Sequence, residues 1–177
     1  MKRAAWVTAV ICVVAFIDLF LFGIYIPPLV WHVQHGNYVE LQGVRYRLPL
    51  LYLARRPVRD QLLIATTSPR FRRKFAEIAL GWHTSRMAEP EEEQFMRTLG
   101  LRKASSRGLT TASRQGTCLE YLPADQEANA KKSAPRTTSI VQCTFAGGLN
   151  AQLIGTQNTI PDFYAILESG EAVQGKH

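Results

Sequence analysis

Residues 138–155, TSIVQCTFAGGLNAQLIG, decide the fold class. Thr138 to Phe145 and Leu149 to Gly155 have the composition of strands, and the short Ala-Gly-Gly segment between them is a compact hairpin connection. Cys118 to Leu122 shows the same strand composition. We therefore predict an antiparallel sheet built from these three segments.

Two cysteines lie in the predicted strands. Cys118 and Cys143 could form a disulfide closing a loop of about 25 residues, which would contribute on the order of 3 kcal/mol in an oxidising compartment. The alternative is two unpaired, buried cysteines in a cytosolic domain. We predict the disulfide, which would connect neighbouring antiparallel strands at the base of a polar, lysine-rich loop.

Further strands and helices are predicted on both sides of this hairpin. Toward the carboxyl end, Thr159 and Asp162 resemble a capping box that opens a helix with Phe163, Ile166 and Leu167 facing inward, and the last seven residues are predicted to fray. Toward the amino end, the predicted elements are a hairpin over 37–48, a strand over 61–67, helices over 68–81 and 89–99, and a loop over 101–116.

The predicted hairpin near the amino end has a defined register. A two-residue Gln42-Gly43 turn would place Leu41 opposite Val44, and Glu40 opposite Arg45. The remaining elements contain no repeat, and no linker separates them. The chain after residue 31 is therefore predicted to be one α+β domain, residues 32–177, with an antiparallel sheet and about three helices.

The amino-terminal stretch is strongly apolar. Lys2 and Arg3 precede about 23 residues, Ala4 to Ile26, in which Asp18 is the only charged side chain. As a helix this run would be ~34 Å long, enough to cross the ~30 Å hydrocarbon layer. It exceeds the length of a signal-peptide h-region, and no small-x-small cleavage site follows it. We predict an uncleaved signal anchor with a single transmembrane helix in residues 1–31; cleavage and secretion of the domain is the alternative.

The orientation of this anchor depends on two observations. Lys2, Arg3 and the terminal amine carry the positive charge before the apolar run, and Arg45 and Arg47 carry it after the run. The difference in positive charge between the two sides is therefore small. The predicted disulfide adds weight to an oxidising location for the domain. We therefore predict a bacterial inner-membrane protein whose domain lies outside the cytoplasm.

Asp18 is the unusual residue of the anchor. It lies about two-thirds along the run, where an ionised carboxylate costs roughly 2.5–3.5 kcal/mol on insertion scales. Small residues at helical spacing, including Cys12 and Ala15, form a stripe beside it on which another helix can approach. One interpretation is a homo- or hetero-oligomer in which Asp18 is hydrogen-bonded across a helix contact. The other is a protonated aspartate tolerated by an apolar helix.

A basic cluster is predicted at the start of the helix over 68–81. It consists of Arg70, Arg72, Arg73 and Lys74. Cations at a helix amino terminus oppose the macrodipole, so contact with anionic lipid headgroups or an acidic partner would explain the cluster. The alternative is a solvated surface neutralised by the domain's own glutamates around position 91.

The sequence carries no recognisable catalytic, cofactor or metal motif. There is no nucleophile elbow, no phosphate-binding glycine loop and no metal-ligand spacing beyond His32-x-x-His35. The net charge is +7, but the basic residues are not interleaved with exposed aromatic residues, as nucleic-acid binding would require. We therefore expect no cofactor, no metal and no nucleic acid. The function favoured is a non-catalytic accessory or binding subunit of a cell-envelope complex; a membrane-tethered enzyme with a dispersed site is the alternative.

Overall fold

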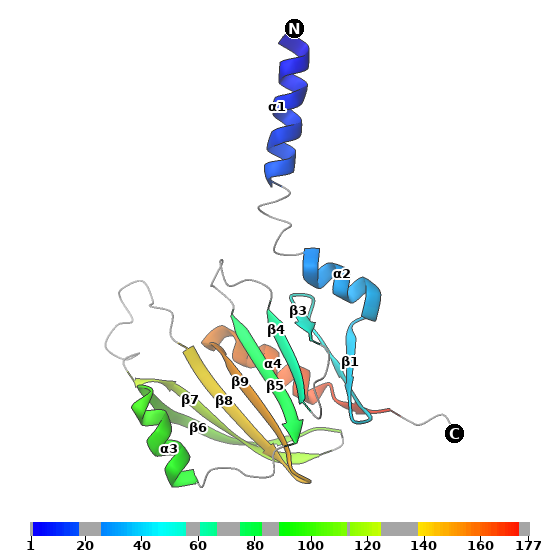
Figure 1. The fold of residues 1–177 in the computed structure, drawn as a ribbon. Helices are drawn as coiled ribbons and strands as arrows, with labels where there is room; N and C mark the ends of the chain where they lie inside the picture. The colour runs from blue at the N-terminus through cyan, green and yellow to red at the C-terminus, as the bar shows by residue number, and fades with distance from the viewer. Residues whose placement is uncertain are drawn as a thin grey trace.

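The structure of the protein is a computed structural model that describes residues 2–17, 26–55, 61–66, 75–82, 89–112, 114–124 and 138–173. Within these ranges the chain forms four α-helices and two antiparallel sheets, as Figure 1 shows. The predicted α+β class is confirmed.

The larger sheet has seven strands in the order β3-β4-β5-β9-β8-β7-β6. Its strands are β3 (Tyr52–Ala54), β4 (Gln61–Thr66), β5 (Ala76–Trp82), β6 (Leu101–Thr110), β7 (Gln115–Pro123), β8 (Thr138–Phe145) and β9 (Leu149–Thr156). The smaller sheet has three strands in the order β1-β2-β10. They are β1 (Tyr38–Leu41), β2 (Val44–Arg47) and β10 (Glu171–Ala172).

The helices are α1 (Lys2–Ile17), α2 (Ile26–His35), α3 (Glu89–Thr98) and α4 (Ile160–Glu168), and a 3₁₀ turn, Gln157–Thr159, precedes α4. Pro161 lies in the first turn of α4, where its missing N–H costs nothing, and Asp162 there complements the helix dipole. The predicted inward face of α4 is confirmed by its buried apolar residues. The predicted capping box does not form, because the Thr159 hydroxyl donates to the carbonyl of Thr156 at 2.7 Å instead.

Among the helices of the described ranges, none is both long enough and apolar enough to span a bilayer. α1 has 16 residues, which is ~24 Å of helix. The predicted transmembrane helix over Ala4 to Ile26 is therefore not confirmed. Pro27 and Pro28 lie in the first turn of α2, where proline is well tolerated.

Both hairpins predicted from sequence are confirmed. In the first, Leu41 pairs with Val44 and Glu40 with Arg45, and Gln42 and Gly43 have the positive φ angles, 50° and 73°, of a tight two-residue turn. In the second, β8 and β9 pair from Thr138 opposite Thr156 to Thr144 opposite Asn150. The helix predicted over 89–99 is also confirmed as α3.

The prediction of a helix over 68–81 is wrong for the residues of that range that the structure describes. Residues 67–74 lie outside the described ranges, and Ala76–Trp82 form β5, which pairs with β4 on one side and β9 on the other. Ala76, Ile78 and Leu80 are fully buried at every second position. Hydrogen bonding to two neighbouring strands and burial of this alternating face favour the strand over the helical spacing of Phe75, Ile78 and Ala79.

The loop predicted over 101–116 is also corrected. Leu101–Thr110 form β6, the edge strand of the larger sheet, with a bulge between Lys103 and Ser105. An edge strand is solvated on several sides, so it lacks the apolar alternation that identifies a buried strand. At the carboxyl end, Glu171 and Ala172 pair with β2 as β10 rather than fraying.

The core lies mainly between the larger sheet and a layer made of α4 and the smaller sheet. Phe163, Ile166 and Leu167 of α4 pack there with alternate residues of the sheet, such as Leu153 and Val141. In Figure 1, α4 crosses behind β5 and β9. A smaller cluster on the opposite face joins Met96 of α3 to the sheet; its other buried members are Leu101, Leu119, Tyr121 and Ile140.

Candidate functional site

Helix α2 is fastened to the domain through His32. This side chain is 7% exposed, and its Nδ1 and Nε2 lie 3.2 Å from the carbonyl oxygens of Gly36 and Pro49, respectively. A neutral imidazole can donate to one of these carbonyls, whereas the imidazolium can donate to both. Trp31, which precedes His32, packs against the main core, and its ring stacks on His35 with centroids 5.0 Å apart. The helix therefore has a fixed orientation on the β2–β3 connection.

A groove opens beside this attachment, between the β2–β3 connection and α4. Its volume is about 480 Å³. It is lined by Asn37, Arg47, Leu48, Pro49, Leu50, Ala165, Ile166 and Ser169. The Ser169 hydroxyl accepts from the backbone N–H of Arg47 at 2.8 Å and donates to the carbonyl of Ile166 at 2.7 Å, which joins the two walls.

The groove combines apolar walls with few polar groups. Leu48 and Ile166 are buried in its floor, while Leu50 is 57% exposed at its rim. The exposed Arg47 and Asn37 add a guanidinium and an amide to the lining. Ligand sites typically have this composition, a mainly apolar surface with a few orienting polar groups. The groove is therefore suited to an apolar segment that carries a carboxylate or another hydrogen-bond acceptor.

Helix α4, one wall of the groove, is held at its amino end by a buried tyrosine. The Tyr52 hydroxyl donates to Oδ2 of Asp162 at 3.0 Å, and Tyr52 is 1% exposed. Burial raises the pKa of Tyr52 well above its ordinary value, and the charge of Asp162 raises it further. The hydroxyl is therefore a neutral donor throughout the physiological range.

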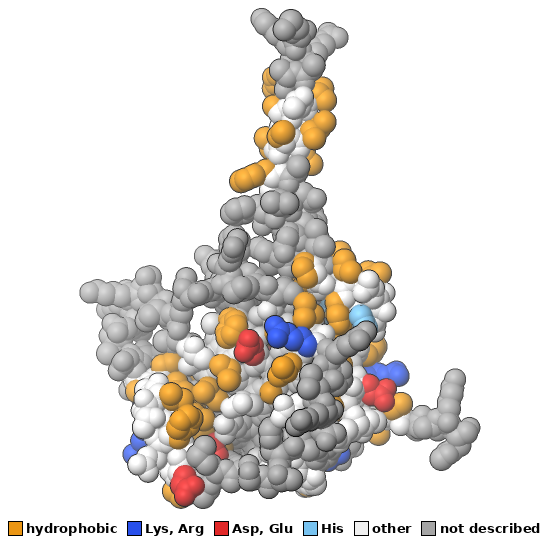
Figure 2. All heavy atoms as spheres, viewed as in Figure 1, with side chains coloured by type: hydrophobic (Ala, Val, Ile, Leu, Met, Phe, Trp, Pro, Cys, Tyr) orange, Lys and Arg blue, Asp and Glu red, His pale blue; other side chains and the backbone are white. Residues whose placement is uncertain are grey.

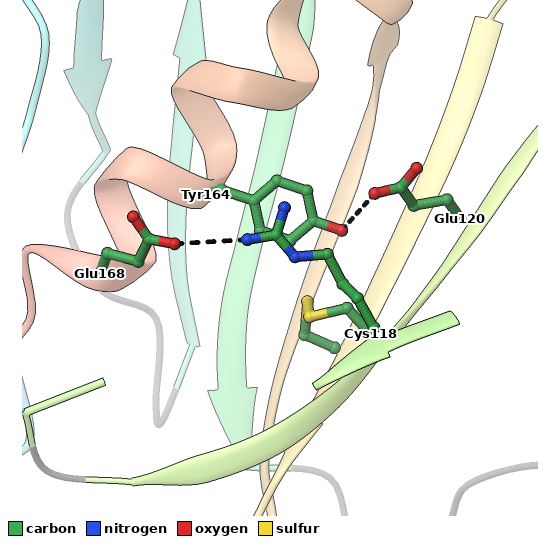
Figure 3. Close-up of a disulfide and its surroundings, with 6 residues drawn as sticks. Cys118, Glu120, Tyr164 and Glu168 are labelled. Carbon is green, nitrogen blue, oxygen red and sulfur yellow. Dashed lines mark hydrogen bonds and ion pairs between the residues drawn. A yellow bond between two sulfur atoms is a disulfide. The ribbon is translucent and has the colours of Figure 1, made fainter. Parts of the chain in front are cut away.

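The other side of α4 is held over β6 and β7 by a cluster beside the disulfide, shown in Figure 3. The Tyr164 hydroxyl donates to Oε1 of Glu120 at 2.6 Å, and the Arg107 guanidinium lies 4.0 Å from the centroid of the Tyr164 ring. Arg107 also pairs with Glu168 at 3.5 Å. Burial, followed by the bond to Glu120, raises the pKa of Tyr164. These contacts hold α4 in position over β6 and β7, and the polar side chains of the cluster are used in making them.

The predicted disulfide is confirmed. Cys118 of β7 and Cys143 of β8 are bonded and lie directly opposite each other in the strand register. Both are buried on the sheet face that α4 covers. Cys12 of α1 is an exposed free cysteine.

The other residues singled out in the sequence are only partly described. Cys12 and Ala15 belong to α1, and Asp18 lies outside the described residues. The basic cluster Arg70, Arg72, Arg73 and Lys74 also lies outside them. The helix contact and the lipid or partner contact predicted for these residues therefore stay predictions.

The groove itself was not predicted. Its walls come from residues 37–50 and 165–169, which are far apart in the sequence, and no motif marks either segment. A second hollow, of about 540 Å³, lies at the β6–β7 turn beside Ala146, but Arg114 in its lining already donates to the carbonyl of Ala146 at 3.2 Å. In the described part of the chain, no group of three or more His, Cys, Asp or Glu side chains is arranged to hold a metal ion.

Comparison with known proteins adds no assignment to this site. No model of a protein family matches the chain, and no curated protein matches it significantly. The geometry of the groove and its position beside α2 therefore carry the functional argument.

Proposed function

We propose that this protein is a single-pass, amino-terminally anchored protein of a bacterial inner membrane, with its domain outside the cytoplasm. In this proposal the domain is a non-catalytic binding subunit of an envelope complex, and the groove between the β2–β3 connection and α4 is its contact site. The observation that carries the proposal is the position of this groove. Pro49 lines the groove, and its carbonyl oxygen lies 3.2 Å from Nε2 of His32 in α2, the helix that follows the apolar run.

Two further observations support the location. The run from Ala4 to Ile26 has one charged residue, Asp18, which suits a hydrocarbon environment. The Cys118–Cys143 disulfide is typical of an oxidising compartment such as the periplasm. Extraction of membranes with alkaline carbonate tests the anchor: the protein is expected to stay in the membrane fraction, and release into the supernatant would contradict the proposal.

The contact site is tested by photocrosslinking in native membranes. A photoreactive amino acid at Leu50 or Ala165, both exposed in the groove lining, is expected to yield a defined adduct. The matched control is the same probe at Ser106, which is exposed on β6 away from the groove. Arg47→Glu is expected to remove the adduct, because it reverses the charge in the groove lining. Equal adducts from Ser106, or insensitivity to Arg47→Glu, would count against the groove.

Association through the amino-terminal helix is tested with the native free cysteine. If the predicted oligomer forms, oxidative crosslinking at Cys12 in membranes is expected to give a covalent dimer. Asp18→Leu is expected to reduce the dimer, because the proposed hydrogen bond across the helix contact is lost. A strictly monomeric protein, or a dimer that Asp18→Leu leaves unchanged, would contradict this arrangement.

A further inference from the structure

One face of α2 is apolar and exposed. Leu29, Val30 and Val33 are 48%, 46% and 79% exposed, whereas Pro28 and His32 are buried. At 100° per residue, the three exposed side chains fall within an arc of about 100°, on the side opposite the face formed by Pro28, Trp31 and His32. Figure 2 shows hydrophobic side chains gathered over this helix. The sequence of α2, IPPLVWHVQH, contains no Asp, Glu, Lys or Arg.

The exposure of this face follows from the way α2 is held. The two carbonyl contacts of His32 and the packing of Trp31 against the core fix the opposite face to the domain. Rotation of the helix to bury Val33 would break both contacts and expose His32 to solvent. The apolar face therefore points outward as a stable feature of the fold.

The chain itself indicates what covers this face. α1 ends at Ile17 and α2 begins at Ile26, so the connection can span at most ~32 Å. The described side chains of α1 that are exposed include Trp6, Val7, Ile11 and Phe16, which require an apolar environment. The medium that accommodates α1 therefore lies within reach of α2. A lipid surface also needs no matching charge or hydrogen-bond partner, and the outward face of α2 offers neither.

We infer that α2 is an interfacial helix, with Leu29, Val30 and Val33 inserted at the boundary between lipid headgroups and acyl chains. This inference rests on the proposed membrane anchoring. It adds a second membrane contact, which fixes how the domain is oriented on the bilayer. Because His32 joins α2 to Pro49, that contact also holds the groove close to the lipid surface.

The test uses the full chain reconstituted into phosphatidylcholine–phosphatidylglycerol vesicles. In a Cys12→Ser background, Val33→Cys is labelled with an environment-sensitive fluorophore, and lipids carrying a spin label high on the acyl chain act as the quencher. We expect severalfold stronger quenching at Val33 than at the control Ser106→Cys, together with a blue-shifted emission. Val30→Asp in the labelled protein is expected to reduce the quenching at Val33 to the level of the control.

The outcomes separate this inference from the proposed anchor. Retention after carbonate extraction with no more quenching at Val33 than at Ser106 would overturn the interfacial role of α2 and leave the anchor standing. Carbonate release with strong quenching at Val33 would support the role of α2 and overturn the anchor. A blue shift without lipid quenching, lost on dilution of the protein in lipid, would overturn the inference in favour of contact with a second copy of the chain.

Discussion

At the scale of single residues, two buried tyrosines hold α4 in place. Tyr52 and Tyr164 each donate a hydrogen bond to a carboxylate, Asp162 and Glu120, respectively. Hydrogen bonds to charged acceptors contribute more than neutral ones, and an acceptor left without its donor carries a desolvation cost. These hydroxyls therefore matter for the position of the groove wall.

Tyr52→Phe is expected to lower the free energy of unfolding by about 1–3 kcal/mol, because the bond to Asp162 is lost without a change in packing volume. The control is Tyr38→Phe, in which the 47% exposed ring and its stacking beneath Arg45 are kept; a change within about 0.5 kcal/mol is expected there. Urea unfolding of both variants checks the prediction. Equal stability of the two variants would show that the Tyr52 hydroxyl contributes nothing.

Three buried tyrosines, Tyr52 and Tyr164 among them, predict a loss of stability in alkali. Burial raises the pKa of Tyr46, Tyr52 and Tyr164 above the ordinary value of about 10. The folded state thus favours the neutral phenol, so this stabilisation is fully present below pH ~10 and declines as the pH rises above it and the unfolded state loses protons. Urea unfolding is expected to show a falling free energy above pH ~10, with a shallower slope in Tyr52→Phe. Identical slopes would contradict the assignment.

At the scale of elements, the disulfide joins the neighbouring strands β7 and β8. Cys118 and Cys143 are 25 residues apart, so the bond restricts a long segment of the unfolded chain. Replacing both by alanine is expected to lower the free energy of unfolding by about 3 kcal/mol. Cys12→Ala is the control and is expected to have no effect, because Cys12 is exposed and free. Denaturant unfolding without reductant compares the three proteins.

The success of the sequence predictions also differs between elements. The β1–β2 and β8–β9 hairpins were predictable, because a short turn and cross-strand partners lie in one continuous segment. For β5 the strand pattern of Ala76, Ile78 and Leu80 was present, but a helical spacing through Ile78 competed with it. The outcome depends on the neighbouring strands β4 and β9. β9 lies about 70 residues later in the sequence, and no local sequence pattern identifies so distant a partner.

At the scale of the whole molecule, the groove shows where prediction from this sequence ends. The disulfide could be predicted, because two cysteines lay in two recognisable strands. The groove depends instead on how residues 37–50 meet residues 165–169, and its polar members, such as Arg47 and Asn37, look like ordinary surface residues in the sequence. Sites assembled from distant segments leave no spacing that can be recognised.

The layered arrangement predicts the effect of removing α4. A chain ending at Thr156 would lose Phe163, Ile166 and Leu167 and leave one face of the seven-stranded sheet uncovered. It is expected to lose cooperative unfolding and to aggregate. A chain ending at Val173 keeps α4 and β10 and is expected to unfold like the full protein. Circular dichroism during denaturant unfolding distinguishes the two, and cooperative unfolding of the shorter chain would show that α4 is dispensable.

The strand order of the larger sheet sets when this protein can fold during its synthesis. β5 pairs with β9 along seven residue positions, and β9 also pairs with β8, so β9 is the strand that joins the two halves of the sheet. Until residues 149–156 have been made, β3, β4 and β5 have no connection to β6, β7 and β8 through this sheet. α4, which completes the core, is made later still. The complete seven-stranded sheet therefore cannot form until nearly the whole chain has been translated. If the domain is exported as proposed above, a chain crossing the membrane during synthesis would still lack this sheet.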